Sequence, residues 1–320
     1  MLATLNAVQH ISAPASLDKL PIHTLTPPSL IKREASRPRL GQISFLNVLP
    51  ILLGLCKTGA VLDVDLHRES PEILNRRLVT DDPKTQLDIS AISLVEYLRN
   101  WDKLLLLPGP AVACDGPVLS VHLFSKVPLS ELDGKKVALG STSRTSVLLA
   151  QLYLTEKIGV KPQWTSCEPN LESGMADADA CVLIGDVALS AMFEAPKHGL
   201  TTYDLGEAWK SWTGLPFVFA VWAVRRDYAA AHPESVKQVA DMLIRARDLG
   251  VAESDRAAEI ASRWENFDQK TLAIYYKALR FYLGPAELEG LCLYARKAAL
   301  YGAAPRRWAE PGARPDFWQL

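Results

Sequence analysis

Two long apolar stretches decide the fold of this chain: PVLSVHLFS, from Pro117 to Ser125, and LPFVFAVWAV, from Leu215 to Val224. Both are rich in β-branched and aromatic residues, which predicts strands. The segment between them has a strand–helix–strand pattern of its own, with the strands KKVALG and ACVLIGD on either side of the helix TSVLLAQLYLTEKIG. An α/β unit inserted between two strands predicts a chain that crosses to a second lobe and then returns. One continuous sheet is the alternative.

The sequence on either side of this insertion extends the pattern. Four further strands are predicted before it: RLGQIS, VLDVDLH, LDISAIS and LLLLP. Helices follow the turn at Asn47, the capping pair Ser70-Pro71 and the strand LDISAIS, so the rhythm predicts a mainly parallel sheet. After Val224 the chain is predicted to be helical to about Tyr301. The predicted fold class is therefore α/β with a discontinuous first lobe.

The predicted limits of the parts follow from these elements. Lobe one comprises residues 39–120 and 218–320, and lobe two comprises residues 121–217. Residues 1–38 are rich in proline and lack an apolar period, which predicts a disordered and dispensable extension.

Composition excludes several classes of protein. The chain has 320 residues with 35 basic and 36 acidic side chains, so no basic surface for nucleic acid is expected. No apolar run approaches the roughly 18 residues of a membrane span. The 5 cysteines are widely spaced, without CxxC or zinc-type spacing, which predicts reduced thiols, a cytoplasmic location and no metal site.

The segment GSTSRTS, from Gly140 to Ser146, is the strongest candidate for ligand binding. It joins a predicted strand to a helix, and its hydroxyl and backbone N–H groups would meet at the positive end of the helix dipole, where anions bind. Ordinary helix capping is the alternative and needs one hydroxyl only. Arg144 would oppose the dipole unless it pairs with a bound carboxylate or points into water. The candidate residues of this loop are Gly140, Thr142, Ser143, Arg144, Thr145 and Ser146.

Other polar residues lie at the ends of predicted strands. Ser44 and Asn47 occupy a strand-to-helix turn, where Asn47 either serves the turn or donates its amide to a ligand. Ser120 lies on the first crossing strand and Ser93 at another strand end. Asp186 follows ACVLIG, where its carboxylate is an acid, a base or simply a helix cap. The histidines show no triad or metal spacing.

These motifs, in this order, resemble the chorismate dehydratase family of the futalosine route to menaquinone. The resemblance runs from about Leu40 to the C-terminal helices. It is carried by GQISFLNVLP, LDISAISLVEYL, CDGPVLSVHLFSKVPL, LDGKKVALGSTSRTS, ADACVLIGDVAL and DLGEAWKSWTGLPFVFAVWA. In a sister family, the 1,4-dihydroxy-6-naphthoate synthases, the early motif resembles a Pro-Cys-Pro-Asn-Asp run. This chain has SFLNVLP in place of that motif, which argues against the sister family.

The resemblance implies a type II periplasmic-binding-protein fold and an enzyme without metal or organic cofactor. It implies conversion of chorismate to 3-[(1-carboxyvinyl)oxy]benzoate and water. We expect a monomer or homodimer, and the sequence does not distinguish the two. Asn47 and Ser120 match the family's active-site positions, and the loop from Gly140 to Ser146 matches its carboxylate-binding loop. The alternative function is a solute-binding protein for a small organic acid.

The residues that carry the resemblance do not identify the base, the group that accepts the proton in the reaction. Asn47 takes no proton near neutral pH, and Ser120 needs an adjacent base to do so. Asp186 is the carboxylate of these motifs that could reach a cleft. The substrate's own enolpyruvyl carboxylate is the other candidate, and we expect it to act as the base, since a tethered group has a high effective molarity.

Overall fold

The computed structural model describes residues 37–140 and 144–319. The chain separates into a unit of residues 1–37 and a compact unit of residues 38–320, and the second contains both sheets. The predicted extension, residues 1–38, lies almost entirely outside the described residues.

Lobe one is built on a six-stranded sheet with the strand order β11-β4-β10-β3-β1-β2. β1 pairs in parallel with β2 and β3, whereas β10 runs antiparallel between β3 and β4, and β11 runs antiparallel to β4. The strands are β1 (Arg39–Ile43), β2 (Asp65–Glu69), β3 (Ile89–Ser93), β4 (Leu104–Cys114), β10 (Phe217–Arg225) and β11 (Leu279–Tyr282).

Lobe two is built on a five-stranded sheet with the order β7-β6-β8-β5-β9. β6 pairs in parallel with β7 and β8, and β5 runs antiparallel to β8 and β9. The strands are β5 (Val121–Ser125), β6 (Lys136–Gly140), β7 (Gln163–Cys167), β8 (Ala180–Ile184) and β9 (Thr201–Asp204). The first sheet thus takes strands from both sides of the second, as the predicted insertion requires, and we keep the predicted lobe limits as a proposal.

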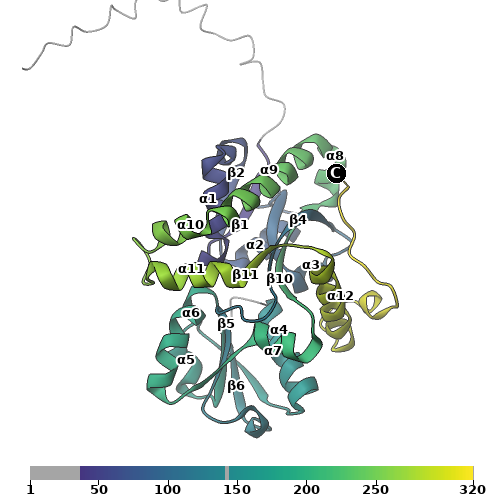
Figure 1. Cartoon of the computed structure of the whole chain (residues 1–320). Coiled ribbons are helices and arrows are strands. Elements are labelled where there is room, and N and C mark those ends of the chain that lie inside the picture. Colours follow the sequence, from purple (N-terminus) through teal and green to yellow (C-terminus); the bar gives the residue numbers. More distant parts are fainter. Residues whose placement is uncertain (1–36, 141–143, 320) are drawn as a thin grey trace, which may run out of the picture. The chain divides into compact units, whose positions relative to one another are not determined.

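Each lobe has its own helices (Figure 1). Those of lobe one are α1 (Leu49–Lys57), α2 (Pro71–Val79), α3 (Leu94–Arg99), α8 (Arg226–Ala231), α9 (Pro233–Ala252), α10 (Ser254–Ala261), α11 (Gln269–Ala278) and α12 (Pro285–Leu300). Those of lobe two are α4 (Arg144–Leu152), continued by a π-helical turn (Tyr153–Ile158), α5 (Leu171–Ala176), α6 (Gly185–Glu194) and α7 (Leu205–Thr213).

Three details differ from the expectations of the sequence. Both sheets are mixed rather than mainly parallel, because β5 and β10, which follow the crossings between the lobes, enter their sheets antiparallel to their neighbours. Residues 117–120 form a turn, not the start of a strand, and Leu119 in that turn has a φ of 62°. β11 interrupts the region predicted to be helical, because its pairing with β4 stabilises a strand that is only 4 residues long.

Two glycines allow α1 and α9 to pack at very close range. A Cβ atom on Gly54 would lie 1.9 Å from the Ala246 carbonyl oxygen, and one on Gly250 would lie 1.9 Å from the Pro50 carbonyl oxygen. No larger residue fits at either position without separating the helices. This contact anchors α1, and therefore the turn that precedes it, to the rest of lobe one.

Aromatic packing joins the two lobes. Trp209 of α7 contacts Phe217 of β10 at 5.1 Å between ring centroids, and Phe217 contacts Tyr294 of α12 at the same centroid distance. All three side chains are buried, and both contacts are edge-to-face, the geometry that aromatic pairs prefer. The start of β10 is therefore held by one helix from each lobe.

Candidate functional site

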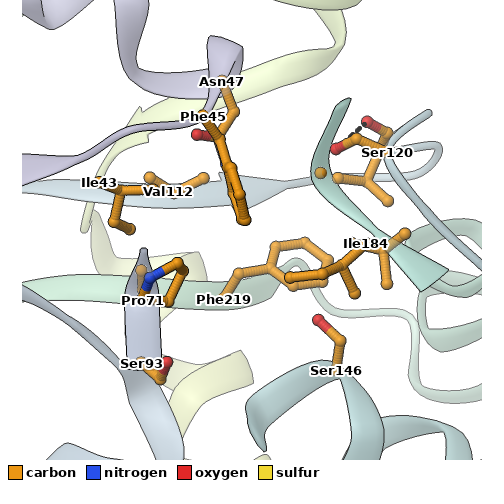
Figure 2. Close-up of a pocket in the computed structure, with 14 residues that line it drawn as sticks. Ile43, Phe45, Asn47, Pro71, Ser93, Val112, Ser120, Ser146, Ile184 and Phe219 are labelled. Carbon is orange, nitrogen blue, oxygen red and sulfur yellow. Dashed lines mark hydrogen bonds between the residues drawn. The ribbon is translucent and has the colours of Figure 1, made fainter. Parts of the chain in front are cut away.

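A cavity lies where the turns at the ends of β1, β3 and β8 meet the crossings between the lobes. It encloses about 470 Å³ of empty space when the open solvent at its mouth is counted. It is lined by Ile43, Phe45, Asn47, Pro71, Ser93, Val112, Val118, Ser120, Val121, Ser146, Ile184, Gly185, Phe219 and Ala220. Figure 2 shows several of these side chains around one space, contributed by both lobes.

Asn47 reaches the cavity from a single 3-10 turn, Leu46–Val48, that links β1 to α1. Its side-chain oxygen is buried and has no hydrogen-bond partner among the described residues. Burying such an oxygen without a partner costs free energy, so a bound ligand that donates a hydrogen bond would be stabilised there.

Ser120 reaches the cavity from the turn that precedes β5. Its side chain is buried, and its Oγ is 3.5 Å from the Val118 carbonyl oxygen, at the limit of a hydrogen bond. The backbone N–H of Gly185 donates to the Ser120 carbonyl at 2.7 Å, which fixes this turn against the start of α6. The bond to Val118 is therefore weak, and the Ser120 side chain also lies next to the Tyr275 side chain of α11.

Ser93 and Ser146 complete the polar part of the wall. Ser93 ends β3, and its hydroxyl accepts a hydrogen bond from the Asn75 amide at 3.0 Å. The Ser93 backbone N–H donates to the Asn75 side-chain oxygen, also at 3.0 Å, so the buried Asn75 fixes this residue. Ser146 is in the first turn of α4, where the helix dipole favours a negative group.

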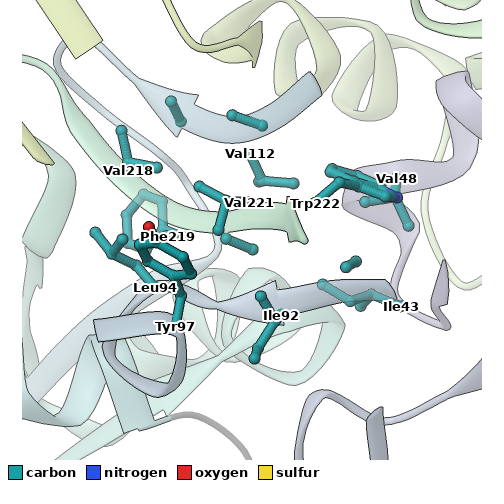
Figure 3. Close-up of a cluster of buried hydrophobic side chains, with 14 of the residues drawn as sticks. Ile43, Val48, Ile92, Leu94, Tyr97, Val112, Val218, Phe219, Val221 and Trp222 are labelled. Atoms are coloured by element: carbon teal, nitrogen blue, oxygen red, sulfur yellow. The ribbon is translucent and has the colours of Figure 1, made fainter. Parts of the chain in front are cut away.

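The rest of the wall is apolar, and its residues were not among the site residues predicted from the sequence. Phe45 and Phe219 point into the same space from β1's end and from β10, beside Ile184 (Figure 2). Ile43, Val112 and Phe219 also belong to the core of lobe one, where they pack with β10 side chains such as Trp222 (Figure 3). The apolar character of β10 is evident in the sequence, but which of its faces meets the cavity depends on strand pairing.

The structure assigns several other predicted site residues to the fold. Ser44 is exposed, and Gly140 is buried at the end of β6, where an added Cβ atom would meet the Val182 carbonyl at 3.0 Å. Thr145 is buried, and its hydroxyl accepts a hydrogen bond from the Val95 backbone N–H at 3.1 Å. None of the three lines the cavity.

The remaining members of the predicted loop are outside the cavity wall or outside the described residues. The Arg144 side chain is 56% exposed and pairs with Glu96 at 3.3 Å. Glu96 is therefore a counter-charge for Arg144, where the sequence suggested a bound carboxylate or water. Thr142 and Ser143 lie outside the described residues.

Asp186 lies beside the cavity rather than in its wall. Both of its carboxylate oxygens accept the backbone N–H of Leu46, at 3.1 and 3.3 Å, so the side chain links the start of α6 to the turn that carries Asn47. Burial raises the pKa of Asp186 to about 6, the Leu46 N–H opposes this shift, and Glu265 adds to it. The carboxylate is thus a contact between the lobes.

Two tyrosines of α11 lie near the site, although no sequence motif marked them as candidates. The hydroxyls of Tyr275 and Tyr276 are buried without a hydrogen-bond partner among the described residues. Burial raises the pKa of Tyr275 well above its ordinary value, and the neighbouring Ser120 side chain opposes the shift. Nothing in the helical pattern around these residues distinguishes them from core tyrosines, because only the packing of α11 brings them close to Ser120 and Asp186.

Two further features of the described residues concern other classes of function. In residues 37–140 and 144–319, no three His, Cys, Asp or Glu side chains gather as metal ligands would. Within the same part of the chain, no helix combines the length and apolarity needed to cross a membrane.

Comparison with known proteins gives a consistent result. The sequence profile of a family described as menaquinone biosynthesis matches residues 38–300. A chorismate dehydratase from Thermus thermophilus is 35% identical over 274 residues, covering 82% of this chain and 95% of that protein. A 1,4-dihydroxy-6-naphthoate synthase from the same organism is 27% identical over 185 residues, covering 52% of this chain and 64% of that protein.

The fold also matches a solved structure at low sequence identity. A Candida albicans protein described as having the generic periplasmic binding protein fold aligns with a TM-score of 0.64 and 12% identity, covering 89% of this chain and 98% of that one. The two-lobed periplasmic-binding-protein fold expected from the sequence is thereby confirmed.

Proposed function

The chain belongs to the menaquinone biosynthesis family, and from this premise we propose that it is a chorismate dehydratase. It would act as a carbon–oxygen lyase that removes water from chorismate and releases 3-[(1-carboxyvinyl)oxy]benzoate. The observation that carries the proposal is the cavity itself, in which Asn47, Ser93, Ser120 and Ser146 are set among apolar side chains. The identity of 35% with a chorismate dehydratase over most of the chain supports the same assignment.

The wall matches the chemical character of this substrate. Chorismate has a partly unsaturated ring that becomes flat in the aromatic product, and Phe45, Phe219 and Ile184 offer apolar contact for it. It also has two carboxylates, for which hydroxyl and amide donors are suitable partners. In the proposal, Ser146 at the start of α4 receives one carboxylate, and Asn47 and Ser120 contact the side chain and the C4 hydroxyl.

The reaction asks little of a strong base. Loss of the C3 proton and the C4 hydroxyl makes the ring aromatic, which drives the elimination. The protein must hold the reacting groups, exclude water and help hydroxide to depart. Hydrogen bonds from Asn47 and Ser120 would stabilise the charge that develops on the departing oxygen.

We assign the proton transfer to the substrate's enolpyruvyl carboxylate, which is tethered next to C3. Asn47 takes no proton, and both oxygens of Asp186 are engaged by the Leu46 N–H. An intramolecular carboxylate can act as an effective base even though it is a weak one, because no entropy is lost in bringing it to the proton. Asp186 then supports the site by linking the lobes.

The proposal extends to the setting of the enzyme. The free cysteines, Cys56, Cys114, Cys167, Cys181 and Cys292, fit a reducing cytoplasm. We propose that it works there as a monomer or homodimer on a small molecule, with no nucleic acid, metal or organic cofactor.

The decisive experiment is incubation of the purified protein with chorismate. We expect chorismate to disappear while an equal amount of the aromatic product forms over many turnovers, with the same rate in the presence of a metal chelator. The alternative, a solute-binding protein for a small acid, predicts one bound chorismate per protein that is released unchanged. Unchanged chorismate would reject the proposed function, and loss of activity in chelator, restored by one metal, would reject the metal-free mechanism.

A further inference from the structure

The turn that presents Ser120 contains an unfavourable backbone conformation. Leu119 has a φ of 62° and is the one non-glycine residue with positive φ among those described. A branched side chain in this left-handed region costs about 1–2 kcal/mol. Such a conformation persists only where surrounding contacts hold it, and the position directly before Ser120 gives it functional importance.

Asp204 holds this turn through its backbone N–H groups. Its Oδ2 accepts the N–H of Leu119 at 2.7 Å and that of Val118 at 3.0 Å. Its Oδ1 meanwhile caps α7, accepting the N–H groups of Gly206 at 2.8 Å and Glu207 at 3.1 Å. One carboxylate therefore joins the turn before Ser120 to a helix 86 residues away in the sequence.

His122 holds the same turn through its backbone carbonyl. Its Nε2 lies 2.9 Å from the Leu119 oxygen, and since a carbonyl only accepts, Nε2 must carry the donated proton. The imidazole is buried, and the same Nε2 is 4.0 Å from Asp204 Oδ2. Asp204 and His122 thus engage the N–H and the C=O of Leu119.

The packing around Asp204 leaves little room for the turn to move. A Cβ atom on Gly206 would lie 2.6 Å from Cys114 Sγ and 2.6 Å from the Gly116 carbonyl oxygen, so the start of α7 is pressed against the segment that leads into the turn. Ser120 itself accepts from the Gly185 N–H at 2.7 Å on its other side.

We propose that Asp204 and His122 are positioning residues that hold Leu119 in its left-handed conformation and thereby aim the Ser120 hydroxyl into the cavity. The inference rests on the proposed function, in which Ser120 contacts the reacting part of chorismate. Neither residue lines the cavity, so both act through Ser120. Their loss should lower kcat much more than it raises KM, because a misaimed hydroxyl affects the transition state more than substrate binding.

The first test replaces Asp204 with asparagine. In Asp204→Asn, the remaining oxygen can still cap α7 and accept the Val118 N–H, which lies 3.1 Å from Oδ1, but an NH₂ group faces the Leu119 N–H. We expect kcat to fall about 10- to 100-fold, the loss typical of a small misplacement, while KM changes by less than about threefold. The matched control is Asp268→Asn, because Asp268 also caps a helix, α11, by accepting the Thr271 N–H at 2.7 Å. The control should stay within about twofold of wild type.

A second substitution separates positioning from general stability. Asparagine tolerates the left-handed region much better than leucine does. Adding Leu119→Asn to Asp204→Asn should therefore recover at least about threefold of the lost kcat, whereas a purely structural role of Asp204 predicts no recovery. For His122, glutamine can present an N–H near the position of Nε2, so His122→Gln should keep more activity than His122→Leu.

Three results would each overturn the inference: unchanged kcat in Asp204→Asn, an equal loss in Asp268→Asn, or no recovery with Leu119→Asn. Amide hydrogen exchange across residues 118–121 provides a readout that does not depend on catalysis. We expect faster exchange there in Asp204→Asn than in Asp268→Asn, and equal exchange would also overturn it. Wild-type protein that leaves chorismate unchanged would instead reject the proposed function, while the exchange result would still report on the turn.

Discussion

The two turns that the sequence marked as polar, residues 44–47 and residues 140–146, use their side chains in different ways. In the first, Asn47 enters the cavity, and the neighbouring Leu46 N–H is bound by Asp186 from the other lobe. In the second, Ser146 lines the cavity, whereas Thr145 holds α3 through Val95 and Arg144 pairs with Glu96. Similar turn chemistry therefore serves the ligand at one position and the fold at the next.

In these two turns, the direction of a side chain matters more than its type. Thr145 and Ser146 are adjacent hydroxyl residues in the first turn of α4, yet the former is used by a backbone N–H of α3. Successive residues on a helix point about 100° apart, so two neighbouring hydroxyls can meet different surroundings. Substitutions in each turn can therefore distinguish residues that serve catalysis from residues that serve stability.

The largest effect is expected for Asn47→Ala. The variant loses an amide that we place at the developing charge, so kcat should fall about 10²- to 10³-fold, as for other amide donors in that role. Folding should be unaffected, which circular dichroism and thermal unfolding will check. Near-normal kcat in this variant would move the catalytic part of the first turn elsewhere.

Asp186→Asn should change the pH dependence of stability. Because burial raises the folded pKa from 3.8 to about 6, the favourable contribution of the protonated group is complete below pH 3.8 and is lost as the pH rises through about 6. Asparagine is never ionised and can still accept from Leu46. Relative to wild type, the free energy of unfolding of the variant should therefore increase by up to about 3 kcal/mol as the pH rises from 4 to 7.

The measurement for Asp186→Asn is denaturant unfolding of both proteins across that pH range, where a constant difference would contradict the expectation. Single-turnover rates at saturating chorismate test its catalytic role in the same variant. We expect measurable turnover. A loss of about 10⁴-fold or more, with binding intact, would identify Asp186 as the base and reject substrate assistance.

Thr145→Val should affect the fold and leave the chemistry in place. Valine has nearly the same shape but leaves the buried Val95 N–H without its partner, which costs about 1–3 kcal/mol. Chemical denaturation should show this loss, while kcat at a temperature where the variant is folded should stay within about threefold of wild type. A large rise in KM with unchanged stability would place Thr145 at the substrate instead.

The smallest effect is expected for Ser44→Ala, the companion of Asn47 in the first turn. Ser44 is exposed and does not line the cavity. The free energy of unfolding of Ser44→Ala should therefore differ from that of wild type by less than about 0.5 kcal/mol. Steady-state kinetics should also match the wild type. A clear kinetic defect would show that the first turn contributes more than one side chain to the site.

Much of the local structure could be predicted from sequence. Ser70 caps α2, with Pro71 at the first helical position, as expected, because both signals act within one turn of the chain. Asn47 and Ser120 could be named because they stand in motifs that resemble a known family. Asp204 could not, because its helix-capping position looks ordinary, and its second role depends on a turn 86 residues earlier in the chain.

By itself, the sequence determined the inserted α/β unit, the order of most strands and helices, and the family. These features depend on local periodicity, capping and motif content, which are properties of neighbouring residues. The tertiary structure alone decided which hydroxyls reach the cavity, which aspartate links the lobes and how Ser120 is held. The Leu46–Asp186 contact spans 140 residues, and such contacts follow from sheet pairing and lobe packing rather than from any local pattern.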